Sequence, residues 1–247
     1  LILNGDFSEE GVQEVSNGSF SQEGVEQADD SVISNAGGSV MTKVSALNYN
    51  ATSDGTGGST IRPRLLFNNT PLGKNYKLII KPTNQSGTIN FKLYNGGSYV
   101  IDNNDLSSDI NFYFSVEGGA SVLIAFDGTE VFNVDFEISL KEVGQDWTLG
   151  TGWSIGDDKA ISDNSGSGIR NLRQNNIVTI GKTYKVTFDA NITSGIPSLI
   201  FGGTTAIVSG INTFYRVATS TDFQIRNASS NFIGSITNIS VKEVGQN

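Results

Sequence analysis

The stretch Phe136-Glu-Ile-Ser-Leu-Lys-Glu-Val-Gly-Gln145 decides the fold, because it recurs near the end of the chain as Thr237-Asn-Ile-Ser-Val-Lys-Glu-Val-Gly-Gln246. In the first copy, Phe136, Ile138 and Leu140 alternate with polar residues, which is the period-two pattern of a half-buried strand. The final Lys-Glu-Val-Gly-Gln is identical in the two copies. A strand that closes one domain and then recurs predicts an internal repeat.

A second pair of matching segments supports the repeat: Gly73-Lys-Asn-Tyr-Lys-Leu78 and Gly181-Lys-Thr-Tyr-Lys-Val186 precede the two closing stretches in the same order. Each half also holds about eight short apolar-alternating segments separated by turn residues, which predicts antiparallel β-sandwiches and almost no helix. Asn95-Gly96 predicts one two-residue hairpin between them. Eight strands favour a jelly roll over a seven-stranded immunoglobulin domain. We therefore predict an all-β chain of two tandem antiparallel jelly-roll β-sandwiches.

The first residues contain a smaller duplication, in which Asn4-Gly-Asp-Phe-Ser-Glu-Glu-Gly-Val-Gln13 is followed by Asn17-Gly-Ser-Phe-Ser-Gln-Glu-Gly-Val-Glu26, identical at seven of ten positions. Two interpretations remain open, a domain-opening motif that serves as an oligomerisation arm and a duplicated linker. The expected organisation is a separate N-terminal segment 1–27, a first sandwich 28–143 and a second sandwich 144–247.

Composition excludes several kinds of site. The chain has no Cys and no His, so disulfides, thiolate or imidazole zinc sites and a Ser-His-Asp triad are excluded. The net charge of −9 disfavours nucleic acid and anionic membranes as partners. No apolar run approaches the ~20 residues that span a bilayer. Because the chain starts at Leu1 without an initiator Met, we expect a processed product or a piece of a longer polypeptide.

Three stretches carry a family resemblance: the opening Asp146-Trp-Thr-Leu-Gly-Thr-Gly-Trp-Ser-Ile-Gly-Asp157, the central Gly181-Lys-Thr-Tyr-Lys-Val-Thr-Phe188 and the closing Ile233–Val244. They resemble the carbohydrate-binding-module type of jelly roll, a galactose-binding-like sandwich found repeatedly in phage virion and tail-fibre proteins. Asn4-Gly-Asp-Phe7 and Asn17-Gly-Ser-Phe20 resemble the Asn-Gly-Asp-Phe start of that family. The resemblance implies a virion setting and a scaffold that often binds glycans.

The chain departs from the resemblance at one position. Related modules often hold a structural calcium through an Asp just before the closing Val-Ser-Val, and that position is Phe136 in one copy and Thr237 in the other. Neither side chain supplies a carboxylate, and Asp135 would point to the opposite face of a regular strand. We therefore expect no family-type calcium, no other cofactor, and an inward-facing Phe136.

The predicted glycan site combines a stacking ring with planar hydrogen-bond donors. Trp147 and Trp153 suit stacking on the apolar face of a pyranose, but large aromatic residues more often fill a core, which we favour here. Arginine and glutamine side chains on several strands suit sugar hydroxyls or carboxylates, with ordinary solvated strand faces as the alternative. The predicted ligand-binding residues are Trp153, Arg170, Arg173, Gln174, Tyr215, Arg226, Arg62 and Arg64, beside Gln224.

Two acidic features are interpreted as structural. The loop Asp102-Asn-Asn-Asp-Leu-Ser-Ser-Asp109 lacks the spacing of a calcium-binding EF-hand loop and is taken as a polar turn. Neighbouring carboxylates such as Asp157 and Asp158 point to opposite faces of a strand, whereas glycoside hydrolysis needs two carboxyls facing across a cleft. No catalytic residues are predicted, and we expect a protein that is not an enzyme.

These observations favour a non-enzymatic virion module with weak glycan binding, placed on a phage fibre, tail or capsid surface. Its expected partners are other virion subunits in a homo-oligomer and cell-surface or mucus glycans, without nucleic acid or membrane insertion. Two alternatives remain open. One is a secreted, extracellular bacterial adhesin or an accessory module of a polysaccharide-degrading enzyme, and the other is an architectural spacer without ligand.

Overall fold

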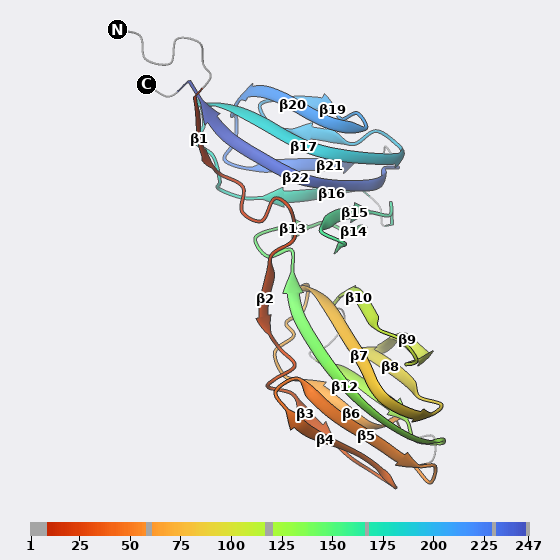
Figure 1. Cartoon of the computed structure of the whole chain (residues 1–247). Helices are drawn as coiled ribbons and strands as arrows, with labels where there is room; N and C mark the ends of the chain where they lie inside the picture. The colour runs from red at the N-terminus through yellow and green to blue at the C-terminus, as the bar shows by residue number, and fades with distance from the viewer. Residues whose placement is uncertain (1–8, 58–60, 117–120, 166–167, 229–230, 246–247) are drawn as a thin grey trace. The chain divides into compact units, whose positions relative to one another are not determined.

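The computed structural model describes residues 9–57, 61–116, 121–165, 168–228 and 231–245. It divides into two compact units, and one of them interrupts the sequence of the other. We call them the inserted sandwich (residues 23–143) and the enclosing sandwich (residues 9–22 and 144–245). Figure 1 shows that all labelled elements of both units are strands. None of the described residues forms a helix, so the predicted all-β class is confirmed.

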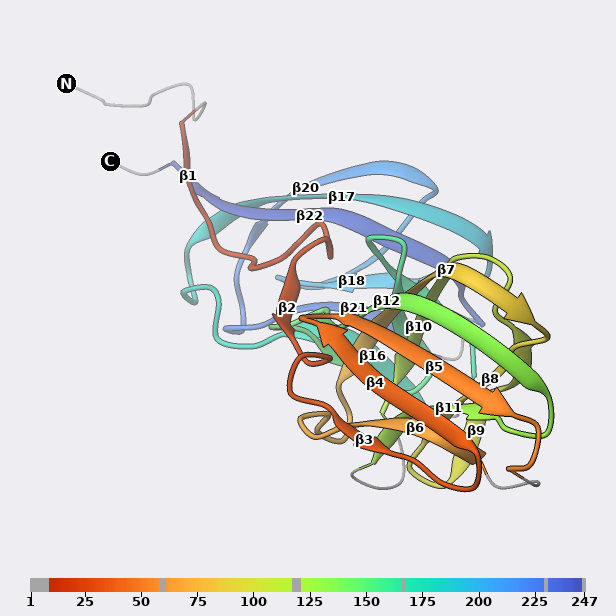
Figure 2. The same ribbon diagram turned by 60° about the horizontal axis from the view of Figure 1, so that its bottom comes forward.

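The inserted sandwich consists of two antiparallel sheets that pack face to face. Its front sheet has the order β10-β7-β12-β5-β4, with β2 added on β12, and its back sheet has the order β3-β6-β11-β8-β9. Figure 2 shows β4 and β5 lying side by side at one edge of the front sheet. The strands are β2 (Glu23–Glu26), β3 (Val32–Ser34), β4 (Ser39–Ser45), β5 (Asn48–Asp54), β6 (Ile61–Phe67), β7 (Asn75–Gly87), β8 (Asn90–Asn95), β9 (Ser98–Asp105), β10 (Ile110–Ser115), β11 (Val122–Asp127) and β12 (Val131–Val143).

The enclosing sandwich repeats the same strand order. Its front sheet is β14-β15-β22-β17-β20 with β1 added on β22, and its back sheet is β13-β16-β21-β18-β19. The strands are β1 (Glu10–Gln13), β13 (Thr148–Leu149), β14 (Trp153–Gly156), β15 (Lys159–Ser162), β16 (Ile169–Gln174), β17 (Thr183–Ser194), β18 (Ser198–Ile200), β19 (Thr204–Ala206), β20 (Gly210–Val217), β21 (Phe223–Ala228) and β22 (Ile233–Val244).

The strand order identifies both units as jelly rolls. Numbered from the first, the eight strands β5 to β12 form one sheet in the order 1-8-3-6 and the other in the order 2-7-4-5, and β15 to β22 do the same. This alternation between two sheets is the double Greek key of a jelly roll. The predicted architecture of two jelly-roll sandwiches is therefore confirmed.

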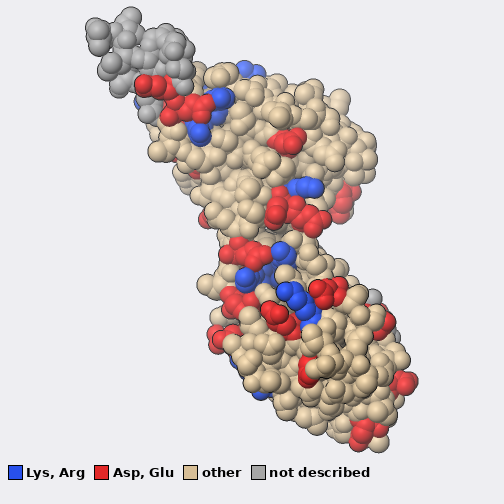
Figure 3. Space-filling view, viewed as in Figure 1, with Lys and Arg blue, Asp and Glu red and all other residues tan. Residues whose placement is uncertain are grey.

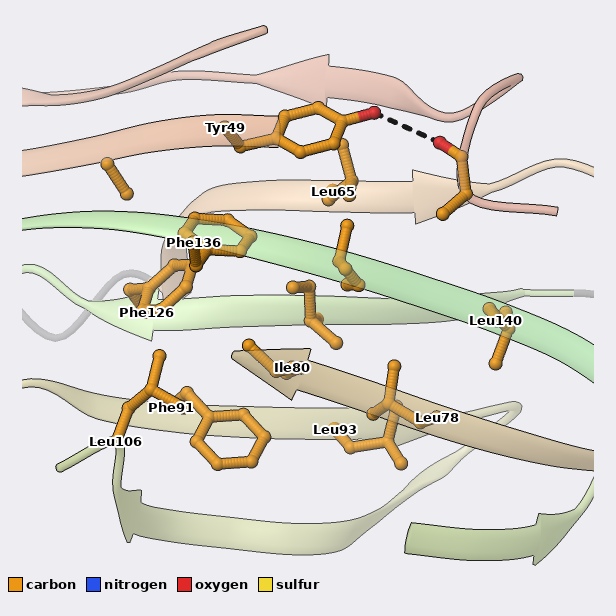
Figure 4. Close-up of a cluster of buried hydrophobic side chains, with 14 of the residues drawn as sticks. Tyr49, Leu65, Leu78, Ile80, Phe91, Leu93, Leu106, Phe126, Phe136 and Leu140 are labelled. Carbon is orange, nitrogen blue, oxygen red and sulfur yellow. Dashed lines mark hydrogen bonds between the residues drawn. The ribbon is translucent and has the colours of Figure 1, made fainter. Parts of the chain in front are cut away.

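The core of the inserted sandwich follows from the period-two pattern. Phe136, Ile138 and Leu140 of the closing strand are at most 1% exposed, while the residues between them face outward. Phe136 packs against Phe126 and Tyr49, with ring centroids 5.4 and 5.7 Å apart (Figure 4). Phe136 therefore points inward, as its place in the alternation predicts.

Two turns differ from the sequence expectation by small shifts. The predicted hairpin exists, but Asn95 pairs with Ser98, so the two turn residues are Gly96 and Gly97, both with positive φ. Asp157 and Asp158 were expected on a strand; they form the two-residue turn between β14 and β15, with φ of 50° and 57°. Asp tolerates this left-handed region better than most residues, which explains its use there.

The duplicated N-terminal motif is divided between the two sandwiches. The strand β1, from its first copy, pairs with β22 of the enclosing sandwich, and β2, from its second copy, pairs with β12 of the inserted one. The structure thus differs from the expected separate segment 1–27, because residues 9–22 belong to one sandwich and 23–27 to the other. Residues 1–8 lie outside the described part of the chain.

Each copy of the motif docks through the same contacts. Glu10 forms ion pairs with Lys185 and Lys242 at 2.5 and 3.1 Å. In the other sandwich, Glu23 lies 2.8 and 3.0 Å from two lysines at equivalent places of the repeat, Lys77 and Lys141. Figure 3 shows mixed acidic and basic clusters in both units, in the neighbourhood of β1 and β2. The motif is therefore a strand that completes each sandwich.

Candidate functional site

The predicted cluster of polar side chains does not lie on one face. Along β16 the side chains alternate, so Arg170 and Gln174 point into the sandwich and are 5% and 2% exposed. Arg173 lies between them in the sequence and faces outward. Tyr215 belongs to β20 of the other sheet and is 57% exposed. The residues predicted to form one cluster therefore lie on opposite faces of one sheet or in different sheets.

Arg170 holds a loop of the enclosing sandwich. Its Nη1 donates to the carbonyl oxygens of Asn164 and Ser165 at 2.7 and 2.9 Å, and its Nη2 donates to Oδ1 of Asn164 at 2.9 Å. Both Nη atoms of this buried guanidinium are thus engaged by the protein. Arg170 is therefore positioned to order residues 163–165.

Gln174 anchors the N-terminal part of the enclosing sandwich. Its Nε2 donates to the carbonyl oxygen of Ser16 at 2.5 Å, and its Oε1 accepts from the Ser16 amide at 3.1 Å. This two-way pairing imitates a strand contact and satisfies a buried amide. Like Arg170, Gln174 has an internal role.

The outer face of the same back sheet carries a row of polar side chains bound to one another. Arg226 Nε donates to Oδ1 of Asn171 at 3.4 Å, and Asn171 Nδ2 donates to Oε1 of Gln224 at 3.3 Å. Arg173 lies 4.0 Å from Asp222. Of the predicted set, Arg173 and Arg226 thus share this face with Gln224, on a surface without a described aromatic ring between them.

Both tryptophans fill the core of the enclosing sandwich, which was the favoured alternative to stacking. Trp153 is 5% exposed and lies 5.7 Å from Phe232, ring centroid to ring centroid. Trp147 is 9% exposed, packs 5.0 Å from Phe20, and donates from Nε1 to the Asn17 carbonyl oxygen at 3.0 Å. Neither ring presents a face on which a sugar could stack, so the inclusion of Trp153 in the predicted binding set is corrected.

A cleft on the inserted sandwich combines aromatic rings with a planar cationic donor, the two features predicted for a glycan site. It has a volume of about 350 Å³ and lies on the outer face of the back sheet. Arg64, one of the predicted residues, lines it. The side chain of Arg62, on the same strand β6, lies outside the described residues. The other lining residues are Leu66, Tyr94, Tyr99, Ser121 and Leu123.

The sheet register places the lining residues in rows. Leu66, Leu123, Tyr94 and Tyr99 face one another on four consecutive strands, β6, β11, β8 and β9. They form one continuous row, with three strand spacings of about 4.8 Å giving a length of roughly 14 Å. The two tyrosine rings meet edge to face, with centroids 5.6 Å apart. The row has aliphatic side chains at one end and aromatic rings at the other.

A second row lies beside the first, two residues along each strand. Arg64 pairs with Ala125, and Ala125 pairs with Lys92. Lys92 lies 3.2 Å from Asp102, and its Nζ is 5.4 Å from the centroid of the Tyr99 ring. Ala125 is fully buried although it points outward, because longer side chains flank it. The cleft therefore joins an apolar and aromatic floor to one cationic donor, Arg64, with Lys92 in the neighbouring row.

Sequence reasoning missed Tyr94 and Tyr99 as site residues. Part of the signal was present, since a hairpin turn at Asn95-Gly96 would put Tyr94 and Tyr99 on the same face, although not opposite each other. Their direct pairing follows from the observed turn at Gly96-Gly97. The sequence did not predict that Leu66 and Leu123 lie beside the tyrosines, because this alignment depends on strands that are distant in sequence.

A second cavity, of about 330 Å³, lies on the enclosing sandwich and differs in chemistry. Its lining includes Lys159, Asp163, Asn191 and Thr193, with no aromatic side chain. A surface of this kind offers hydrogen bonds but no ring for stacking. The cleft lined by Tyr94 and Tyr99, which we call the tyrosine cleft, is therefore the stronger candidate.

The structure shows which contacts surround the positions at which related modules hold calcium. Asp135 faces away from the core and accepts hydrogen bonds from Asn50 and Asn84, at 2.8 and 3.1 Å, which lower its pKa. Thr237 donates to the carbonyl oxygen of Asp158. Among the side chains that the structure describes, no group of three or more acidic residues is close enough to hold a metal ion.

The acidic stretch predicted as a polar turn is partly strand, because Asp102 belongs to β9 and only residues 106–109 connect β9 to β10. This stretch borders a separate cavity of about 400 Å³. Asp102 and Asp109 line it together with Phe112. Calcium needs six to eight oxygen ligands, and one of these carboxylates already pairs with Lys92.

In the described ranges there is no helix long and apolar enough to cross a membrane.

Comparison with known proteins gives likenesses at the level of solved structures. No family model matches the chain, and no curated protein matches it. The N-terminal CBM22-1-CBM22-2 tandem domain from Paenibacillus barcinonensis Xyn10C is similar over 90% of this chain and 98% of its own, at 11% identity and a TM-score of 0.32. A Paenibacillus xanthan lyase is similar over 92% of this chain, at 16% identity and a TM-score of 0.33.

The chain spans only 26% of that xanthan lyase. A putative secreted protein from Parabacteroides distasonis is similar over 92% of this chain and 98% of its own, at 7% identity and a TM-score of 0.25. At such identities and TM-scores, the likenesses say nothing about what this chain binds. The assignment of both units as jelly rolls comes from their own strand order.

Proposed function

We propose that the protein is a non-enzymatic glycan-binding module whose binding surface is the tyrosine cleft of the inserted sandwich. The observation that carries the proposal is the row Leu66, Leu123, Tyr94 and Tyr99 beside Arg64. Pyranose rings have an apolar face, formed by their C–H groups, and a rim of hydroxyls. An aromatic ring on a rigid sheet with polar donors beside it matches both features.

The dimensions and openness of the cleft suit a short oligosaccharide bound weakly. Tyr99 is 37% exposed, so part of its side chain reaches solvent on the surface of the sheet. The floor is carried by regular strands, which keep the tyrosines in place before a ligand arrives. A single shallow site of this kind gives low affinity, and several copies on one assembly would raise the avidity.

The proposed setting is the surface of a phage virion, as part of a fibre, tail or capsid and in contact with other subunits of a homo-oligomer. This setting rests on the family resemblance of the opening, central and closing strands. The alternative of an adhesin or an accessory module of a polysaccharide-degrading enzyme uses the same cleft. Locating the chain by electron microscopy on intact particles separates these settings, and its absence from particles contradicts the virion proposal.

The binding proposal is tested by screening the purified protein on a glycan array and titrating the hits by nuclear magnetic resonance. Tyr99→Ala removes the exposed ring and is expected to abolish binding, while leaving the fold intact because Tyr99 lies on the edge strand β9. Tyr215→Ala is the matched control, since this tyrosine is also exposed but lies on the enclosing sandwich. Loss of binding in the Tyr215 variant, with the Tyr99 variant unaffected, would assign the site to the other unit.

A further inference from the structure

The cation that lines the tyrosine cleft, Arg64, differs from its neighbours in having no described acidic partner. Lys92, in the same row, is neutralised by Asp102 at 3.2 Å. Arg173, on the outer face of the equivalent sheet in the enclosing sandwich, lies 4.0 Å from Asp222. Among the described residues, no Asp or Glu lies within 4 Å of the Arg64 guanidinium. Arg64 therefore brings to the cleft a positive charge that no acidic side chain in the described part of the chain balances.

The location of this charge is set by the backbone. Arg64 and Leu66 point to the same face of β6, so the guanidinium starts about 7 Å along the strand from the apolar row. Its cross-strand neighbour is Ala125, whose short side chain takes up little space between Arg64 and Lys92. Arg64 is half-buried, which lessens the screening of its charge by water. A ligand that rests on the tyrosines would meet the guanidinium at its edge.

We propose that the cleft selects acidic sugars, with the carboxylate of a uronic or sialic acid type residue paired to Arg64. This inference rests on the proposed function of the same site. The planar guanidinium matches a carboxylate through two parallel N–H donors, a geometry that neutral hydroxyls use less well. The rings of Tyr94 and Tyr99 pack against the apolar face of the sugar, and Arg64 forms an ion pair with its carboxylate. The net charge of −9 does not oppose this, because recognition depends on the local field of the cleft.

The equivalent face of the enclosing sandwich gives an internal contrast. There the arginines are engaged by Asp222 and Asn171, and Ile200 and Thr204 form the edge strand pair that corresponds to Tyr94 and Tyr99. Arg226 also lacks an acidic partner among the described residues, since Asn171 is neutral, but that face has no described aromatic ring on which a sugar could stack. One acidic-sugar site per chain is therefore expected, on the inserted sandwich.

The test is a titration of the whole protein with matched acidic and neutral oligosaccharides, monitored by isothermal calorimetry. The pairs are oligogalacturonate against its methyl ester, glucuronate-containing against glucose oligomers, and sialylated against desialylated N-acetyllactosamine. The acidic member of at least one pair is expected to bind about tenfold or more tightly, with a preference that falls as salt is added. Arg64→Gln should abolish the preference while keeping the affinity for the neutral member, and Arg173→Gln should leave both unchanged.

Each outcome decides between the two levels of the proposal. Equal binding of acidic and neutral members, or a preference that survives in Arg64→Gln, overturns the acidic-sugar inference and leaves glycan binding standing. Absence of binding to every member of every pair, and to a glycan array, overturns both. Loss of the preference in the Arg173 variant would move the charge recognition to the enclosing sandwich.

Discussion

Phe20 provides the sharpest test of the nested arrangement. It belongs to the second copy of the N-terminal motif, whose strand β2 completes the inserted sandwich, yet its side chain packs in the core of the enclosing sandwich. It is 1% exposed, and its ring centroid is 5.0 Å from that of Trp147. Phe20→Ala is therefore expected to destabilise the enclosing sandwich and not the inserted one.

The magnitude follows from the burial. Replacing a fully buried phenylalanine by alanine costs about 3–5 kcal/mol, through lost apolar contacts and the cavity that remains. With a urea dependence of about 1–3 kcal/mol per molar, the unfolding midpoint should fall by roughly 1–5 M. The cavity would border Trp147, whose indole also donates to the Asn17 carbonyl oxygen, so little collapse is expected there.

Tryptophan fluorescence makes the assay specific. The chain has two tryptophans, Trp147 and Trp153, and both belong to the enclosing sandwich. Urea unfolding followed by fluorescence thus reports that unit, while circular dichroism reports both. The matched control is Phe91→Ala, a fully buried residue of the inserted sandwich, which should leave the fluorescence midpoint in place. An unchanged fluorescence midpoint in Phe20→Ala would refute the nesting of residues 9–22 in the enclosing sandwich.

Two further predictions concern charged residues. Arg170→Ala should lower the fluorescence-detected stability of the enclosing sandwich by about 1–3 kcal/mol, because the carbonyls of residues 164 and 165 lose their donors. Glycan titrations should stay unchanged. Reduced sugar binding in a folded variant would show that Arg170 belongs to the binding site. Hydrogen bonds from Lys77 and Lys141 hold the pKa of the Glu23 carboxyl below its ordinary value of 4.5. The stability that Glu23 contributes is therefore present above that pH and is lost as pH falls through the lower folded-state pKa. Glu23→Gln should therefore destabilise the inserted sandwich by about 1 kcal/mol or less at neutral pH. Unfolding followed by circular dichroism at several pH values should show the difference from wild type vanishing in acid. A difference that persists at about pH 2 would contradict the ion-pair explanation.

Much of the fold could be predicted because strand periodicity is a local property. Phe136, Ile138 and Leu140 face the core as their alternation implies, since a strand must turn every second side chain to the same side. The candidate site was harder to predict, because it depends on which strands become neighbours. Arg64 was selected for its residue type, but the tyrosines beside it come from β8 and β9, which reach it only through β11.

The sequence by itself determined the repeat, the all-β class and the jelly-roll type, because these follow from alternating patterns, turn residues and two matching closing strands. Only the tertiary structure decided which sandwich each copy of the N-terminal motif completes. The two copies are identical at seven of ten positions, and each meets a pair of equivalent lysines, Lys185 and Lys242 or Lys77 and Lys141. The shared local chemistry therefore does not distinguish the two choices. The distinction comes from non-local packing, above all Phe20 against Trp147, residues that lie far apart in sequence and meet only in the folded core.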